Sequence, residues 1–324
     1  MSALRRFIVR APFASRTDLR GQRIIVTGTA PGSIGFETAR ALAAWGADVV
    51  VTTRRDTETV AAQLRAAIAS EPGRGTITAQ PLDLADAASV EHFVAWYRDT
   101  QGERLDVLVN NAGIHLDLLS QWKTPKLTAD GFELHWRTNY LGTMHLTLRL
   151  LPLLQSTARA HGGARIVNVV SMLHDKGRNT GLFGINDPYN SWVAYGNSKL
   201  ALVHATFELQ RRFDADGIQA YCLHPGAVFT NIADKGLAGN PALERLRKAF
   251  AFVERFFLLT PEEGAQTTLL CATASSAKGG AYYRNCGVAK ASSESTDAAV
   301  SARLLDETQA WIERSAQRQE QPST

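Results

Sequence analysis

The chain has 324 residues, of which 45% are hydrophobic, and it carries a formal net charge of +4. This length and apolar content suffice for one large buried core, and no change in composition divides the chain into separate domains. The positive charges are spread thinly and form no runs interleaved with aromatic residues, so nucleic acid is not an expected partner.

The first 18 residues are basic, because four arginines precede the first acidic residue, Asp18. We expect residues 1–18 to form a basic arm packed across the bottom of the domain, with a transit peptide as the alternative. The apolar stretch Phe7–Val9 is too short to cross a bilayer, and no other segment is long enough to do so. We therefore expect no transmembrane segment and a cytoplasmic location.

A predicted buried strand, Arg23–Thr27, runs directly into a glycine-rich turn at residues 28–35. Apolar residues at helical spacing follow as far as Gly46, and residues 47–52 read as a second strand. This order of strand, turn, helix and strand is typical of a nucleotide-binding βαβ unit. The glycines let the backbone approach a pyrophosphate, and the helix N-terminus presents free N–H groups to it.

Polar side chains follow two later predicted strands: Asn110 comes after residues 105–109, and Ser171 comes after residues 165–170. Tyr195 and Lys199 lie four positions apart, which places them on one face of a helix. A nearby ammonium favours the phenolate and would bring the phenol into the range where it exchanges protons with an alcohol or carbonyl. Taken alone, the pair also fits a half-buried tyrosine beside a solvated lysine.

Together these segments resemble the short-chain dehydrogenase/reductase family, most closely its retinol-dehydrogenase-like and WW-domain-oxidoreductase-like members. The family's glycine turn is matched by Thr27, Gly28, Gly32 and Gly35, and the narrower likeness lies in residues 128–133 and 279–286. One departure is that Ser33 and Ile34 separate the last two glycines where the family has a single residue.

The alternation of strands and helices and the resemblance both point to a doubly wound α/β (Rossmann) fold with a seven-stranded parallel sheet and helices on both faces. We expect a single dehydrogenase/reductase domain at residues 19–312, with a substrate-loop insertion at about 231–260. A polar C-terminal tail covers residues 313–324.

The resemblance also implies the site residues. The catalytic tetrad would be Asn139, Ser171, Tyr195 and Lys199. Cofactor-binding residues would come from the glycine turn, the strand ends and the tetrad: Gly28, Gly32, Ser33, Ile34, Gly35, Arg54, Arg55, Asp83, Leu84, Asn110, Tyr195, Lys199, Val228 and Thr230.

The end of the second predicted strand indicates the cofactor. NAD-preferring members place an acid there for the ribose 2′-hydroxyl, whereas NADP users offer positive charge to the 2′-phosphate. Here Arg54 and Arg55 occupy this place, and Asp56 beyond them is interpreted as a cap of the next helix. The sequence therefore predicts NADP.

The resemblance assigns a role to each member of the tetrad. Tyr195 exchanges a proton with the substrate oxygen, Lys199 lowers the phenol's pKa and binds the nicotinamide ribose, and Ser171 holds the substrate oxygen. Asn139 would order a water that links Lys199 to solvent. His115 and His174 lie close to these motifs, but such residues are more often satisfied loop histidines, and we leave both out of the predicted site.

The insertion suggests the substrate. Leu243, Leu246, Phe250, Val253 and Phe257 repeat at helical spacing, which fits a core or dimer contact and also an apolar lid over the nicotinamide. Trp192 would add apolar surface to the same cavity. We expect a bulky lipophilic alcohol, ketone or aldehyde, because an apolar cavity would leave the hydroxyls of a sugar unpaired.

Two other functions stay open: a non-catalytic NADP-binding regulatory or scaffold protein, and an enoyl reductase, which the lengthened glycine turn suggests. No metal site is predicted, because Cys222, Cys271 and Cys286 are too widely spaced, and we expect buried free thiols in a reducing compartment. A homodimer and a homotetramer are both compatible with the sequence.

Overall fold

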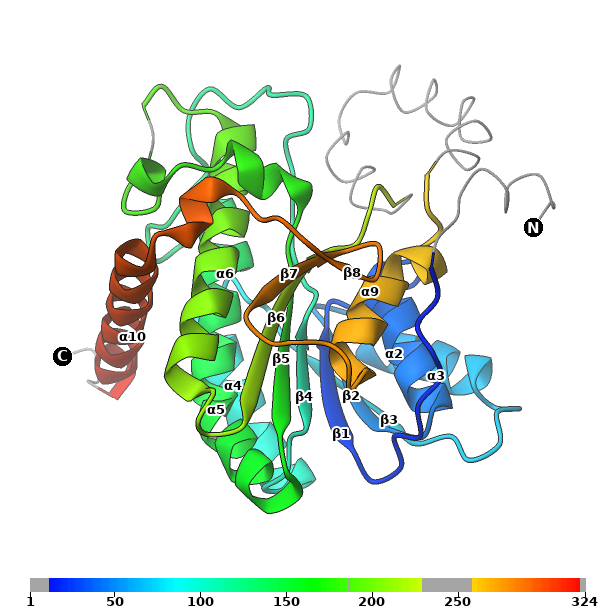
Figure 1. The fold of residues 1–324 in the computed structure, drawn as a ribbon. Coiled ribbons are helices and arrows are strands. Elements are labelled where there is room, and N and C mark those ends of the chain that lie inside the picture. Colours follow the sequence, from blue (N-terminus) through cyan, green and yellow to red (C-terminus); the bar gives the residue numbers. More distant parts are fainter. Residues whose placement is uncertain (1–11, 186, 229–257, 321–324) are drawn as a thin grey trace.

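The computed structural model describes residues 12–185, 187–228 and 258–320, and it forms one sheet with helices on both faces (Figure 1). The strands are β1 (Arg23–Thr27), β2 (Asp48–Thr53), β3 (Ile77–Pro81), β4 (Val107–Asn110), β5 (Ala164–Val169), β6 (Ile218–His224), β7 (Ala281–Arg284) and β8 (Gly287–Ala289). The α-helices are α2 (Ile34–Ala44), α3 (Thr57–Ala67), α4 (Ala87–Gln101), α5 (Gly142–His161), α6 (Ser191–Phe213), α9 (Pro261–Thr273) and α10 (Ala298–Glu320). Short helical turns are η1 (Trp136–Leu141), η2 (Met172–Lys176), η3 (Asn179–Gly181) and η4 (Ser293–Thr296).

The described sheet runs in the order β3-β2-β1-β4-β5-β6-β7-β8. Strands β1 to β7 are parallel, as expected, and the chain reverses its direction of winding between β1 and β4. The predicted count of seven strands is one short, because β8 pairs antiparallel with β7. Asn285 and Cys286 join the two strands with φ angles of 51° and 56°, which is the backbone of a tight two-residue hairpin turn.

Helices α2, α3 and α9 cover one face of the sheet, and α4, α5 and α6 cover the other. Each face has its own apolar core. Helix α10 lies further out, where it packs against α5 and α6 (Figure 1). Within the described residues, no helix is long and apolar enough to span a bilayer.

The first residue of a helix can be predicted from the sequence where a polar capping residue precedes the helix. Ser33 accepts a hydrogen bond from the Phe36 N–H and begins α2. Thr260 and Glu263 form a reciprocal capping box at the start of α9, directly after the predicted insertion. Asp56 stands at the cap position of α3, but its φ is 55° and its side chain makes no capping bond, so the predicted cap is only partly right.

Residues 12–18 belong to the predicted basic arm, of which residues 1–11 lie outside the described part. The Ala14 N–H donates to Gln266 Oε1 on α9, and Arg16 donates to the Ala44 carbonyl at the end of α2 and to Glu71. The described part of the arm therefore descends along the α2 and α9 side of the domain (Figure 1) before it reaches the bottom.

Candidate active site

A groove of about 650 Å³ lies at the carboxyl ends of the central strands, where the winding reverses. This is the place where open parallel sheets bind ligands. Most of the predicted site residues line it: Gly28, Ser33, Ile34, Arg54, Asp83, Leu84, Ser171, Tyr195, Lys199 and Val228. The predicted insertion lies mostly outside the described residues, but its flanks meet here, since the Leu259 N–H donates to the Ala227 carbonyl at 2.9 Å.

The glycine turn brings backbone to the groove. Gly28 has φ 72°, and a Cβ there would lie 2.7 Å from Ala112 Cα, so only glycine fits. Ser33 and Ile34 open helix α2 and line the groove, so that the extra residue of this turn lies at the helix N-terminus. The first N–H groups of a helix have no partner within it, which suits them to a phosphate.

At the other end of the groove, Ser171, Tyr195 and Lys199 meet. Ser171 follows β5, caps η2 by accepting from the Leu173 N–H, and lines the groove together with Tyr195. Tyr195 and Lys199 lie one turn apart on α6. The Lys199 ammonium donates to the Val169 carbonyl at 3.2 Å, which fixes it over the end of β5.

The electrostatics of this end differ from the expectation. Burial raises the pKa of Tyr195 to about 12, and the nearby Ser171 side chain only partly opposes this rise. Burial also lowers the pKa of Lys199 to about 8. The ammonium lies 5.8 Å from the centre of the phenol ring. The pKa of Tyr195 is therefore raised in this structure and not lowered as predicted, because desolvation of the phenolate is the largest cause.

Asn139 lies in the π-helical turn η1, a helix distortion that often marks a functional site. Its Oδ1 accepts from the Ile114 N–H at 2.7 Å, and its Nδ2 donates to the Ile114 carbonyl and to Ser198 Oγ. A Cβ on Gly113 would lie 3.0 Å from Lys199 Nζ and 3.3 Å from Asn139 Oδ1. Asn139 thus ties the loop after β4 to α6 beside the ammonium, and its role in ordering water stays a prediction.

The arginines at the end of β2 are exposed, and within the described part of the chain neither side chain forms an ion pair or hydrogen bond. Arg54 lines the groove, whereas Arg55 does not. Asp83 lines the groove beside them and accepts from the Ala85 N–H at 2.9 Å. This corner therefore offers a free guanidinium next to a fixed carboxylate.

Some predicted cofactor residues do not line the groove. The Asn110 side chain is buried and donates to Thr147 Oγ1 and Asn168 Oδ1, so it braces the sheet beneath the groove. Gly32 and Gly35 shape the turn without lining the groove. Thr230 lies outside the described residues.

His115 was left out of the predicted site, yet its ring stacks on Tyr195 with centroids 4.3 Å apart and planes 13° apart. Trp192 meets the edge of the same imidazole at 4.8 Å. Burial lowers the pKa of His115 to about 4, so the ring is neutral near pH 7. The signal in the sequence for placing His115 at the site is its position two residues after Gly113. His174, in contrast, is the satisfied loop histidine expected, bonded to the Ser171 carbonyl and the Ser292 N–H.

The buried ammonium predicts a pH-dependent stability. The folded pKa of Lys199, about 8, lies below its ordinary value of 10.5, so its proton favours unfolding at neutral pH, and this cost fades as the pH rises from 8 to 10.5. Lys199→Met is expected to raise the free energy of unfolding by about 1–3 kcal/mol at pH 7 and by less at pH 10. Urea unfolding at both pH values measures the difference, with the exposed Lys176→Met as control. An equal gain at both pH values would contradict this assignment.

Comparisons with known proteins agree on the family. The family model of the short chain dehydrogenases matches residues 22–240. The chain is 33% identical to human retinol dehydrogenase 11 over 309 residues, which is 94% of this chain and 89% of that protein. It is 37% identical over 306 residues to a Streptomyces antibioticus protein named Probable oxidoreductase, covering 89% of this chain and 94% of the relative.

A solved complex of Pseudomonas aeruginosa RhlG with NADP superposes with a TM-score of 0.60 at 26% identity, covering 82% of this chain and 94% of that one. The fold, the groove at the switch point and these likenesses agree. The chain belongs to the short-chain dehydrogenase/reductase family of oxidoreductases and is close to its retinol-dehydrogenase-like members.

Proposed function

We propose that the protein is an NADP(H)-dependent alcohol dehydrogenase/carbonyl reductase that interconverts a lipophilic alcohol and its ketone or aldehyde. The observation that carries this proposal is the groove itself. It joins a half-buried Tyr195, beside Ser171 and one turn from Lys199, to Arg54 at the far end, whose side chain has no partner among the described residues.

The residues present fit a dinucleotide phosphate. Gly28 leaves room for close backbone approach, and Ser33 and Ile34 present the N-terminus of α2 to the groove. Arg54 would meet the adenosine 2′-phosphate, and Asp83 would lie on the adenine side. When bound, the nicotinamide supplies or accepts the hydride, which no protein side chain can do.

The proposed work of the protein is proton transfer and positioning. Tyr195 Oη gives its proton to the substrate oxygen during reduction and takes it back during oxidation. Ser171, which lines the groove beside the phenol, holds that oxygen. Lys199 adds positive charge beneath the phenol and would bind the nicotinamide ribose. Asn139 fixes the loop that carries Gly113 against the ammonium.

The surroundings of Tyr195 favour an apolar substrate. His115 is neutral and stacks on the phenol, and Trp192 packs against the His115 ring. The relative named retinol dehydrogenase 11 points in the same direction by its name. The apolar stripe of the insertion, residues 243–257, lies outside the described residues, so its role as a lid is part of the proposal. A cytoplasmic location and a homodimeric or homotetrameric assembly likewise stay predictions.

The test is steady-state NADPH oxidation along a homologous series of aldehydes or methyl ketones. We expect kcat/KM to climb with chain length, since each buried methylene adds about 0.8 kcal/mol, or roughly a fourfold gain. A sugar aldehyde of equal size is the control and should react poorly. A flat or falling trend would contradict the lipophilic substrate, and NADPH binding without turnover of any carbonyl would favour the regulatory alternative.

A further inference from the structure

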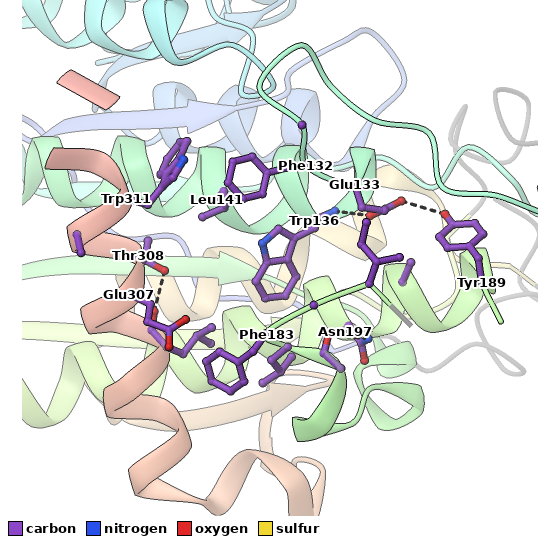
Figure 2. A pocket seen from close by; sticks show the side chains of 18 of the residues that line it. Phe132, Glu133, Trp136, Leu141, Phe183, Tyr189, Asn197, Glu307, Thr308 and Trp311 are labelled. Carbon is purple, nitrogen blue, oxygen red and sulfur yellow. Dashed lines mark hydrogen bonds between the residues drawn. The ribbon is translucent and has the colours of Figure 1, made fainter. Parts of the chain in front are cut away.

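A second cavity lies behind the catalytic helix. It measures about 420 Å³ and is lined by the turn before η1, residues 181–185 and 189–190, α6 and α10 (Figure 2). From α6 it takes Ala194 and Asn197, whereas the groove takes Tyr195 and Lys199. At 3.6 residues per turn these pairs point to roughly opposite sides of the helix. The cavity is therefore separate from the groove of the proposed reaction.

Aromatic side chains make up much of the wall. Figure 2 shows the rings of Phe132, Trp136, Phe183, Tyr189 and Trp311 set around the cavity, with Trp311 contributed by α10. Arg303 already stacks on Phe183 at 3.8 Å, and Arg137 lies 5.0 Å from the Trp311 ring centre. Phe183 and Trp311 thus each have an arginine of the protein over the ring, whereas no such contact is found for Phe132, Trp136 and Tyr189 among the described residues. The face of an aromatic ring attracts positive charge.

A buried carboxylate faces the same cavity. Glu133 is only 5% exposed, and its oxygens accept from Tyr189 Oη at 3.0 Å and from the Trp136 N–H at 2.8 Å (Figure 2). They also accept from His135 Nδ1 at 2.9 Å. His135 Nε2 accepts from the Leu116 N–H, so this ring carries its proton on Nδ1 and is neutral. Burial alone would raise the pKa of Glu133, but its contacts with His135 and with the Trp136 N–H outweigh burial and lower the pKa, so the carboxylate is charged near pH 7.

Within the described residues, Glu133 has no lysine or arginine partner. Among the side chains that the structure describes, only the neutral His135 meets the ion-pair criterion with it. The other carboxylate of the wall, Glu307, is 53% exposed and is already paired with Arg303 at 2.7 Å. Arg314, also at the wall, is exposed to solvent. A buried charge without a counter-charge is costly, and a ligand that brought one would relieve that cost.

We propose that this cavity is a binding site for a lipophilic monocation, such as an aromatic or alkyl quaternary ammonium, with its charge between the aromatic rings and Glu133. An apolar wall with a few convergent polar groups is the usual form of a small-molecule site. Aromatic rings beside a carboxylate are the chemistry that selects a cation over a neutral molecule of the same shape.

The probe is benzyltrimethylammonium, and the control ligand is neopentylbenzene, which has the same shape and no charge. Calorimetry and ligand-observed NMR on the full chain with saturating NADPH should show the cation binding at least about tenfold more tightly than its isostere. Equal affinity for both, no binding of the cation, or its displacement by NADPH would overturn the proposal.

Two variants locate the site. Glu133→Gln keeps the shape and should remove the preference for the cation, whereas the matched Glu307→Gln should retain it. If Glu133→Gln fails to fold, Ala310→Trp decides, because it places an indole from α10 into the cavity and should abolish binding. Unchanged binding in Ala310→Trp, or equal losses in the two glutamine variants, would show that the cation binds elsewhere.

Discussion

Tyr195→Phe is expected to lower kcat by roughly 10²-fold or more, the scale of one positioned acid/base group. The change removes the exchangeable proton and keeps the ring, so the stack with His115 and the shape of the groove should survive. NADPH should therefore bind with little change in its dissociation constant. Single-turnover stopped-flow measurements separate the chemical step from cofactor binding.

Tyr97→Phe is the matched control for this variant. Tyr97 is a buried phenol on α4 that donates to the Arg104 carbonyl, far from the groove in the fold. Loss of this hydrogen bond in Tyr97→Phe should lower the free energy of unfolding by about 1 kcal/mol and leave kcat near the parent value. Parent-like chemistry in Tyr195→Phe, or an equal loss of rate in both variants, would remove Tyr195 from the acid/base role.

Replacement of both Arg54 and Arg55 by alanine is expected to erode the preference for NADP over NAD. One charge-assisted hydrogen bond to a phosphate is worth about 1.5–3 kcal/mol, or roughly 10- to 100-fold in binding. The effect should appear mainly as a higher KM for NADP, with kcat and the KM for NAD little changed. Initial rates with the two cofactors provide the comparison.

The two single variants show which arginine contributes more to NADP binding. Arg54 lines the groove and Arg55 does not, so Arg54→Ala should carry most of the loss and Arg55→Ala should stay near the parent protein. A parent protein that already prefers NAD would refute the cofactor assignment without any substitution. A loss confined to Arg55→Ala would place the phosphate elsewhere on this corner.

The sequence predicts those parts of the fold that depend on neighbours along the chain. The strand Arg23–Thr27 and the glycine turn that follows it are each encoded in consecutive residues, and both appear where expected. The family and its Rossmann fold follow from several such motifs in one order, and both are confirmed.

Features made by distant segments were missed. The stack of His115 on Tyr195 joins residues 80 positions apart, and no periodicity announces it. The second cavity depends on Trp311 of α10 meeting Phe132, again a contact between remote parts of the chain. The pKa of Tyr195 was predicted wrongly for a related reason, since spacing along a helix reveals a neighbouring charge but not the depth of burial.

The hairpin of β7 and β8 has a consequence for how the molecule behaves in a crowded solution. Without β8, the edge of β7 would present unpaired N–H and C=O groups to other chains, which is how sheets grow into aggregates. β8 covers that edge with only three residues, and the tight turn before it bends the chain back. Such a short antiparallel strand is a poor template for a strand from another molecule. The hairpin therefore protects the parallel sheet from edge-to-edge association with other chains.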